Sequence, residues 1–502
     1  PVTSEFQQYP IGDPINGSPH SVCVSLPTMA DVIGYEEKDP EVLNSFAAGY
    51  PRFFLNPLIS RLSALWEQEG CMHATDPLLP TEAAALDLCA FLKIDEQSIA
   101  PVADFWTVRL RECPQMHDEA RAFLQHTGCG LSSREAEDAL ERWHGIPGFK
   151  EERLHDSPHA NRQRIRSQLH HIYGTASEQD IHIFRSGMNA FYAGFRALQS
   201  IQLERQRDLW IQLGWIYVDT SRILERFALP GARPMQVYSV MDLTELRDVL
   251  AAEGYRVAGI VTEVPTNPLV QTPDLQALRD LADKYKAALI LDPTLVSPHN
   301  VNVLAFSDIH INSLTKYAAS EADVMMGALA LNAKSRFYDD LLPLVDVFGT
   351  VPSSGDLGRM AIQIQHYPET IKAINANTIQ VATFLESHPG VESVYWARSQ
   401  PSAYNYNWLQ HLEAGPGGII SFTVRKPLAD FYDRSRLVKS PSFGARFTMM
   451  CPFMYLAHFD LVKSPQGRAI LKAQGVDPEL VRLSVGLEPP EAIIRELDRT
   501  LR

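Results

Sequence analysis

The stretch Arg256–Asp292, RVAGIVTEVPTNPLVQTPDLQALRDLADKYKAALILD, decides the fold. It starts with an apolar run that predicts a buried strand and passes through a turn-forming segment into an amphipathic helical pattern. Pro273 stands where the first turn of that helix is expected, and a second apolar strand, ALILD, follows the helix. The order strand, helix, strand is typical of the units from which parallel sheets are built.

The same alternation continues on both sides of this stretch. Further strands are predicted at IHIF (181–184), QVYSV (236–240), DIHINS (308–313) and MMGALALN (325–332). Helices are predicted from Ser186 to about Gln199 and over DLTELRDVLAAEG (242–254). Near-continuous apolar strands alternating with amphipathic helices predict an α/β fold with a mostly parallel sheet that is covered on both faces.

The two ends of the chain differ from this central part. Turn formers dominate YPIGDPINGSPH, so residues 1–50 are expected to form an extended arm. From about 71 to 176 helix formers prevail without a strand signal, which predicts a helical insertion. We therefore expect an arm (1–50), a large domain (51–350) that carries this insertion, and a small α+β domain (351–502). The small domain would hold a long helix (about 356–388), two strands and a last helix.

Composition excludes several classes of protein. The 502 residues carry 45 Lys and Arg against 60 Asp and Glu, a net charge of −15, which disfavours nucleic acids and anionic membranes as partners. Apolar runs such as ALIL are far shorter than the roughly 20 residues of a membrane helix. The six cysteines include no CxxC pair, so we expect reduced thiols in a cytoplasmic protein. The first residues show no pattern of a signal peptide.

Polar residues follow the predicted strands at the points where the strands end. They are Ser186-Gly187-Met188, Glu263 to Pro268, Asp292-Pro293-Thr294 and Ser313-Leu314-Thr315-Lys316. Ligands of parallel α/β sheets bind at the carboxyl ends of the strands, so we expect these groups to converge.

The chemistry of this set fits one cofactor. A helix N-terminus binds phosphate, and the alternating hydroxyls of Ser313 and Thr315 are expected to point to the same side and to assist. A buried carboxylate such as Asp292 holds a protonated ring nitrogen, and a lysine such as Lys316 forms a Schiff base with an aldehyde. Phosphate, ring nitrogen and aldehyde are the three groups through which proteins bind pyridoxal 5′-phosphate (PLP). Each residue taken alone has an ordinary structural explanation as a cap, a turn former or a surface lysine.

The chain resembles the Cys/Met-metabolism family of PLP-dependent enzymes, in its cystathionine γ-synthase-like, fungal-type branch. The resemblance is carried by EVPTNPLVQTPDLQALRDLADKY, LILDPTLVSP, DIHINSLTKYAASEADVMMGALA, NANTIQVATFLESHPGVESVYW and VRLSVGLE, and by the N-terminal HSVCVSLPTMADVIGYEEKDPEVLNSFAAGYPRFF. It covers most of the chain outside 71–176 and implies PLP fold type I, an aspartate-aminotransferase-like architecture.

The resemblance also implies roles for single residues. Lys316 would be the Schiff-base lysine and Asp292 the partner of the ring nitrogen, with Tyr217 stacked on the ring and moving protons. Arg482 would bind the substrate carboxylate, aided by Ser442. The remaining cofactor contacts would come from Gly187, Met188, Ser313, Thr315 and Asn267, and from Tyr50 and Arg52, which in this family reach the phosphate in a neighbouring subunit.

The activity implied is a γ-replacement in which cysteine displaces the acyl group of an O-acylhomoserine to give cystathionine. A γ-lyase or a sulfhydrylase on the same scaffold, or a protein that has lost its chemistry and only binds, remain alternatives. The resemblance implies amino-acid substrates and a homo-oligomer, a dimer with shared active sites or a tetramer.

Departures from the family pattern lie around Tyr217 and in the loop that begins at Ser442, which in the family helps to decide which amino acid and leaving group are accepted. Tyr217-Val218-Asp219-Thr220 replaces Tyr-Gly-Gly-Thr, and Ser442-Phe443-Gly444-Ala445-Arg446-Phe447 replaces Ser-Leu-Gly-Gly-Val-Glu. No metal site is expected, since Pro158 separates His155 from His159. The helical insertion is expected to decorate the surface, extend a subunit interface or cover the mouth of the active site, and its sequence does not choose among these.

Overall fold

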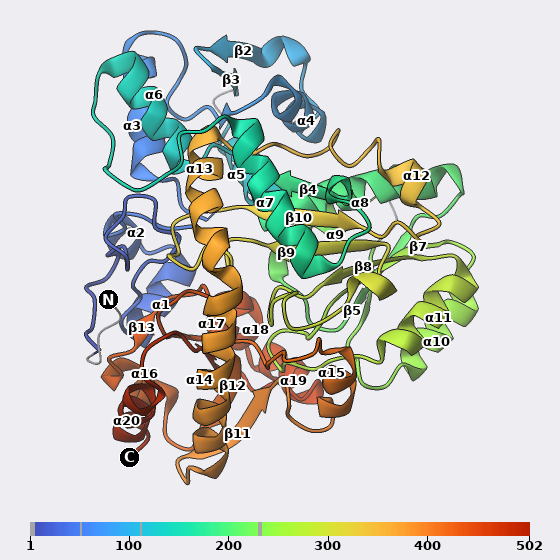
Figure 1. Cartoon of the computed structure of the whole chain (residues 1–502). Coiled ribbons are helices and arrows are strands. Elements are labelled where there is room, and N and C mark those ends of the chain that lie inside the picture. The colour runs from blue at the N-terminus through green and yellow to red at the C-terminus, as the bar shows by residue number, and fades with distance from the viewer. Residues whose placement is uncertain (1–5, 51–52, 111–112, 229–232) are drawn as a thin grey trace.

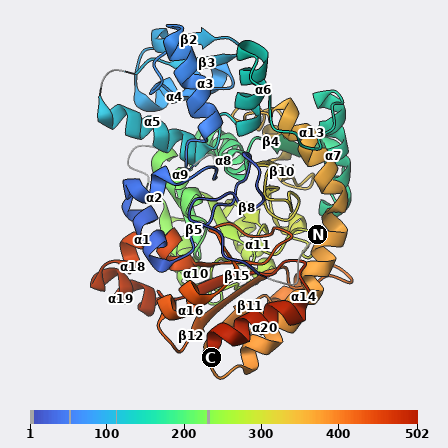
Figure 2. The same cartoon turned by 90° about the vertical axis from the view of Figure 1, so that its left-hand side faces the viewer.

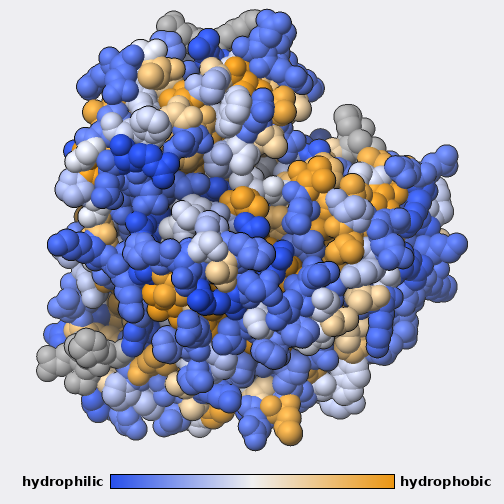
Figure 3. Space-filling model, turned by 45° about the horizontal axis from the view of Figure 1, so that its top comes forward, coloured by the Kyte–Doolittle hydropathy of each residue, from blue (hydrophilic) through white to orange (hydrophobic). Residues whose placement is uncertain are grey.

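The computed structural model describes residues 6–50, 53–110, 113–228 and 233–502. Figure 1 shows three layers: a block built mainly from residues between 57 and 144 at the top, the central α/β unit, and the C-terminal unit at the bottom. Hydrophilic residues cover most of the face in Figure 3, and hydrophobic residues gather there in several smaller groups. Among the described residues no helix combines the length and apolar character that crossing a membrane requires.

The central sheet confirms the predicted α/β fold. Its seven strands lie in the order β4 (Ile181–Phe184), β10 (Gly327–Leu331), β9 (Ile309–Ser313), β8 (Ala288–Asp292), β7 (Val257–Glu263), β5 (Leu209–Leu213), β6 (Met235–Val237). The strands from β9 to β6 are parallel, and β10 runs antiparallel to both of its neighbours. β5 was not predicted as a strand, and the strand predicted at 236–240 is shorter than expected.

Both faces of this sheet are buried. In β8, Leu289 and Leu291 join one apolar cluster, whereas Ala288 and Ile290 join another, because successive side chains of a strand point to opposite faces. The covering helices are α7 (Pro158–Tyr173), α8 (Gly187–Glu204), α9 (Val218–Phe227), α10 (Thr244–Glu253), α11 (Leu275–Tyr285) and α12 (Tyr338–Leu341). In α11 the N-cap is Asp274, so Pro273 lies just before the helix and not in its first turn.

The C-terminal unit is an α+β layer, as predicted. Its five-stranded sheet has the order β11 (Val391–Trp396), β12 (Ile419–Val424), β15 (Val481–Ser484), β14 (Met449–Pro452), β13 (Val438–Lys439). Its helices are α13 (Ser354–Gln363), α14 (Tyr367–Ser387), α15 (Ala403–Leu409), α16 (Leu428–Arg434), α17 (Phe453–Ala457), α18 (Phe459–Val462), α19 (Pro465–Ala473) and α20 (Pro490–Leu501). The single helix predicted over about 356–388 is divided by a 3₁₀ turn, Ile364–His366, just before Pro368, whose missing N–H disfavours an uninterrupted helix.

The block at the top corrects a prediction. It contains α3 (Pro57–Gln68), α4 (Glu82–Leu92), α5 (Pro114–Thr127) and α6 (Ser133–His144), but also a small antiparallel sheet of β1 (Leu78–Leu79), β3 (Phe105–Val108) and β2 (Ile99–Val102). The strands are short, Pro101 interrupts their pattern, and the turn between them uses Ala103 at φ 52° instead of glycine. The block has an apolar core of its own that includes α3, so it begins before residue 71.

Residues 6–50 are not extended throughout either. They form α1 (Met29–Glu37) and α2 (Pro40–Asn44), and a capping box between Thr28 and Asp31 starts the first helix. Val24, Leu26, Met29 and Val32 share an apolar cluster with strands β12 and β15 of the C-terminal unit. Figure 2 shows α1 and α2 next to the C-terminal unit, where α1 packs against α16 and α17.

Candidate functional site

A cavity of about 1560 Å³ opens at the carboxyl ends of β7, β8 and β9. Glu263 and Asp292 end two neighbouring strands and are paired in register, and Ser313 ends the third. The residues predicted from the sequence that line this cavity are Tyr50, Gly187, Met188, Tyr217, Asn267, Asp292, Ser313, Lys316, Ser442 and Arg482. The predicted convergence of the strand ends is therefore present in the structure. Arg52 lies outside the described residues.

The N-terminus of α8 forms one end of the cavity. Ser186 caps the helix by accepting a hydrogen bond from the N–H of Asn189, so the N–H groups of Gly187 and Met188 are left at the first turn. A Cβ atom at position 187 would come within 2.8 Å of the Cβ of Ser313. Only glycine lets the helix start this close to β9, where the helix N-terminus and the Ser313 hydroxyl can meet one phosphate.

Thr315 does not share the position of Ser313. Strand β9 ends at Ser313, so the alternation expected of an extended segment does not continue to Thr315. Its buried hydroxyl donates to the carbonyl of Met326 at 3.2 Å and accepts from the N–H of Met326 at 3.0 Å. The expectation that both hydroxyls point to the same side is wrong, and Thr315 instead fixes the turn that presents Lys316.

Asp292 and Glu263 are a buried acidic pair. Burial raises the pKa of Asp292 to about 6, although hydrogen bonds from Thr294 and the charge of Lys316 act in the other direction. Burial and the Asp292 charge hold the pKa of Glu263 well above its ordinary value. Glu263 accepts a 2.6 Å hydrogen bond from the N–H of Tyr217 and so fixes the start of α9. Sequence reasoning assigned Glu263 no such role.

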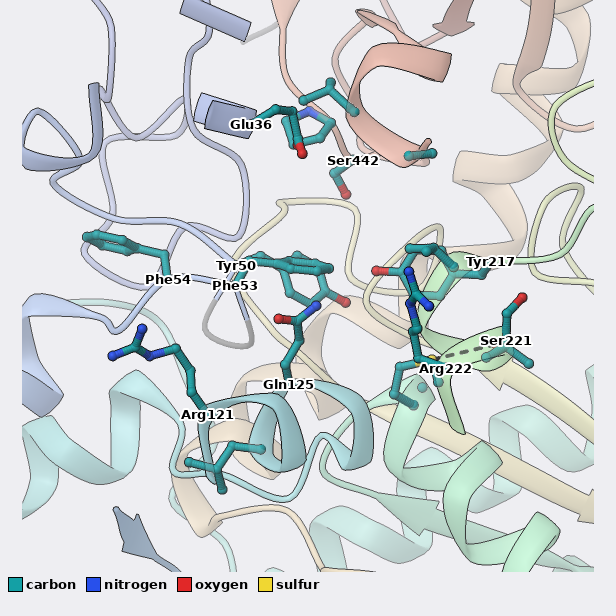
Figure 4. A pocket seen from close by; sticks show the side chains of 18 of the residues that line it. Glu36, Tyr50, Phe53, Phe54, Arg121, Gln125, Tyr217, Ser221, Arg222 and Ser442 are labelled. Atoms are coloured by element: carbon teal, nitrogen blue, oxygen red, sulfur yellow. Dashed lines mark hydrogen bonds between the residues drawn. The ribbon is translucent and has the colours of Figure 1, made fainter. Parts of the chain in front are cut away.

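Lys316 lies at the centre of the cavity wall. Its Nζ is 3.2 Å from the Oγ of Ser442, 4.9 Å from the ring centroid of Phe443 and 5.1 Å from that of Tyr50. Tyr50 therefore lies beside the lysine of its own chain. Figure 4 shows Tyr50 and Gln125 on one side of the cavity and Tyr217 and Arg222 on the other, with Ser442 above them.

Arg482 is 4% exposed and projects from β15 into the cavity. It donates hydrogen bonds to the carbonyls of Pro441 and Ser442 at 2.7 and 3.1 Å, and its guanidinium lies 5.0 and 4.8 Å from the rings of Phe443 and Phe453. These contacts hold the guanidinium in place and leave its charge to be balanced by an anionic ligand.

The residues present fit PLP. The buried side-chain oxygen of Asn267 has no hydrogen-bond partner among the described residues, although Asn267 lines the cavity. The buried Asp292 carboxylate gains from a cationic ring nitrogen, and the first turn of α8 gains from a phosphate. Within the described part of the chain no cluster of three or more His, Cys, Asp or Glu side chains has the arrangement of a metal site.

Helix α5 supplies a part of the cavity wall that no motif in the sequence announced. His117, Ala120, Arg121, Leu124 and Gln125 all line the cavity. One part of the insertion therefore contributes to the cavity wall. The only sequence signal is the amphipathic pattern of α5, which a helix packed elsewhere would share.

Comparisons with known proteins find relatives over nearly the whole chain. A dechlorinase/desaturase of L-2-amino-4-chloropent-4-enoate from Streptantibioticus cattleyicolor is 39% identical over 96% of both chains. Cystathionine gamma-synthase from Neurospora crassa is 29% identical over 98% of both chains. A crystal structure of cystathionine gamma synthase from Xanthomonas oryzae pv. oryzae shares the fold, with a TM-score of 0.58 and 23% identity over 70% of this chain and 89% of that one.

The family model of Cys/Met metabolism PLP-dependent enzymes matches residues 158–502, which hold the strands, the helix N-terminus and the lysine described above. From this match and the full-length relatives, the chain belongs to the Cys/Met metabolism family of PLP-dependent enzymes.

Proposed function

We propose that the protein binds an L-α-amino acid that carries a leaving group on Cγ and expels that group in a γ-elimination. The observation that carries the proposal is that Lys316, Asp292 and Arg482 line one cavity. PLP, when bound, withdraws electrons from Cα of the substrate. Asp292 would hold a proton at the ring nitrogen, and Arg482 would bind the carboxylate of the amino acid.

Side chains around Lys316 would carry out the proton transfers of the reaction and contact the substrate. Its amine is the best-placed base for the Cα proton, with the Ser442 hydroxyl 3.2 Å away to hold it in position. Tyr217, whose backbone is fixed by Glu263, would cover the cofactor ring and assist in removing the Cβ proton, whose electron pair expels the leaving group from Cγ. The rings of Phe443 and Phe453 make the wall near Arg482 apolar, which suits an uncharged side chain that ends in a chlorovinyl group. This reaction is also consistent with the name of the 39% identical relative.

A γ-replacement, in which cysteine displaces the acyl group of an O-acylhomoserine to give cystathionine, is the second candidate. Arg222 lines the cavity, and because its 2.8 Å pair with Glu225 is exposed and therefore weak, a second carboxylate can compete for its guanidinium. The Neurospora crassa relative, named cystathionine gamma-synthase, also favours it.

The two reactions are separated by their products. The PLP-loaded protein is incubated with L-2-amino-4-chloropent-4-enoate, and with O-acetyl- or O-succinylhomoserine in the presence and absence of cysteine. We expect chloride release and a more unsaturated five-carbon amino acid, detected by mass spectrometry, without any added thiol. Cystathionine formed only when cysteine and an acylhomoserine are both present would move the assignment to γ-replacement. No product from any of these substrates would contradict both candidates.

Replacing Arg482 by lysine is expected to lower kcat/KM about 100-fold, mainly through KM. Lysine keeps the charge but loses the planar pair of donors that matches a carboxylate. The exposed Arg425→Lys is the matched control, and its kinetics should be unchanged. Steady-state kinetics with the substrate identified above measure the effect. An unchanged KM in Arg482→Lys would show that another residue binds the carboxylate.

A further inference from the structure

A group of buried polar side chains lies behind the cofactor site and takes no part in the chemistry described above. Asn312 and Tyr173 are 3% and 4% exposed, and neither lines the cavity. We infer that Asn312 and Tyr173 are positioning residues that act on the cofactor site through Thr294. Together they fix the spacing between Asp292, which would pair with the ring nitrogen of PLP, and Ser313, which would meet its phosphate. This role rests on the PLP site and not on the reaction proposed above.

Thr294 joins the ends of β8 and β9. Its N–H donates to Oδ1 of Asp292 at 2.8 Å, and its hydroxyl oxygen accepts from the N–H of Ser313 at 2.9 Å. Burial raises the pKa of Asp292, and a hydrogen bond from the Thr294 hydroxyl to the carboxylate acts in the other direction. A single side chain therefore links the two residues between which the cofactor would lie, so its position sets their spacing.

Asn312 holds the Thr294 hydroxyl from the side that faces away from the cavity. It precedes Ser313 in β9, so its side chain points to the opposite face of the strand. Its Oδ1 lies 3.4 Å from Oγ1 of Thr294, where it accepts a long hydrogen bond. The Asp292 carboxylate, the N–H of Ser313 and the amide oxygen of Asn312 thus surround this hydroxyl and hold its side chain in one orientation.

Tyr173, the last residue of α7, sets which end of the Asn312 amide faces Thr294. Nδ2 of Asn312 donates to the hydroxyl oxygen of Tyr173 at 2.7 Å. Because the nitrogen of a side-chain amide only donates and its oxygen only accepts, the phenol at Nδ2 directs Oδ1 toward Thr294. The ring of Tyr173 packs against the buried ring of His310, with ring centroids 4.6 Å apart, so the phenol itself is held in place.

A second buried phenol reaches the same amide from α14. The hydroxyl of Tyr367 is hydrogen-bonded to Asn312 and to Ser297, whose Oγ lies 2.6 Å away. Two helices therefore each place a phenol at Asn312, which has two amide protons to donate. Loss of either phenol would leave an amide proton without its acceptor in a buried site, which costs free energy unless the amide turns away from Thr294.

Tyr173→Phe tests this role, because it removes only the hydroxyl that receives the Asn312 amide. The full-length protein is depleted of cofactor and titrated with PLP, and binding is followed by visible absorption. We expect the Kd of PLP to rise about 10-fold. Tyr406→Phe is the matched control, since this buried tyrosine donates to Gly415 O at 2.7 Å and does not line the cavity, and its Kd should be unchanged. An unchanged Kd in Tyr173→Phe, or an equal rise in both variants, would overturn the inference.

A double-mutant cycle shows whether Tyr173 acts through Thr294. Thr294→Val keeps the shape of the side chain but loses the hydroxyl, so it should raise the Kd of PLP by itself, whereas Thr294→Ser should bind PLP like the wild type. Adding Tyr173→Phe to Thr294→Val should cause no further rise, because the hydroxyl that Asn312 orients is already gone. A further 10-fold rise would show that Tyr173 acts by another route and would overturn the inference.

Urea unfolding of the cofactor-free variants shows that each of them is folded. If Tyr173→Phe does not fold, Tyr367→Phe removes the other phenol at the same amide and is measured in its place, with the same expected results. Because PLP binding is measured without turnover, these results do not depend on the substrate, and a failure of the γ-elimination proposed above would leave them unchanged.

Discussion

Replacing Lys316 by alanine is expected to lower kcat by at least about 1,000-fold, because the amine that removes the Cα proton is lost. The variant should also lose the visible absorption of lysine-bound cofactor, while the fold should persist, since Thr315 and Ser313 form the turn through other atoms. Activity assays and spectra of the PLP-incubated protein measure both effects.

Peptide mapping after borohydride reduction identifies the lysine that carries the cofactor. Lys439 is the other lysine with a chemical reason to react, since burial lowers its pKa to about 8. Its ammonium, however, donates to the carbonyls of Pro27 and Asp433, and Lys439 is absent from the cavity lining. We expect the reduced cofactor to label Lys316 alone. Lys334 is exposed, so Lys334→Ala serves as the control variant and should remain active. Label on Lys439, or full activity of Lys316→Ala, would contradict the assignment.

The central fold could be predicted because its local signals and its packing agree. The runs that became β7, β8 and β9 are buried on both faces, and each ends in the polar residue that reaches the cavity. The ends of neighbouring parallel strands meet at one edge of the sheet, so reading these ends gave the positions of Glu263, Asp292 and Ser313. The strand order therefore places these three residues at the same edge of the sheet, and the register of the strands sets the distances between them.

The predictions that failed concern segments whose structure depends on contacts between distant parts of the chain. Thr315 follows the strand, and its hydroxyl binds the backbone of Met326, a pairing that residue alternation does not contain. The N-terminal segment is rich in turn formers, yet its apolar residues find partners on β12 and β15, far away in sequence. The Thr28 to Asp31 capping box was a signal for α1 that the composition of the segment obscured. The wall formed by α5 had no sequence signal, since only its position next to α9 gives it a role.

Replacing Asp292 by asparagine is expected to lower kcat about 100-fold or more in the PLP-loaded protein. The side chain keeps its shape and its place beside Thr294, but a neutral amide no longer stabilises a proton on the cofactor ring. Asp308→Asn would be a poor control, because Asp308 binds Arg279 and the N–H of Leu289, whereas the exposed Asp280→Asn leaves the sheet unchanged.

The same substitution should have the opposite effect on the stability of the cofactor-free protein. Because the pKa of Asp292 is about 6 in the folded chain and its ordinary value is 3.8, the folded chain binds a proton more tightly than the unfolded one. Ionisation of Asp292 therefore lowers the free energy of unfolding as the pH rises between these two pKa values. Asparagine does not ionise, so Asp292→Asn does not lose this stability. We expect the wild-type protein and Asp292→Asn to have equal urea unfolding midpoints near pH 4. At pH 8 the midpoint of Asp292→Asn should be higher than that of the wild type.

Binding of PLP should cancel this difference, since a cationic ring nitrogen offsets the buried charge that destabilises the empty site. Urea unfolding of both proteins at pH 4, 6 and 8, with and without the cofactor, measures the effect. A midpoint difference that does not change with pH, or that is unchanged by PLP, would show that Asp292 is not the partner of the ring. The buried Asp292 carboxylate thus lowers the stability of the cofactor-free protein, and bound PLP removes this effect. The stability of the fold is therefore coupled to the chemistry of the site.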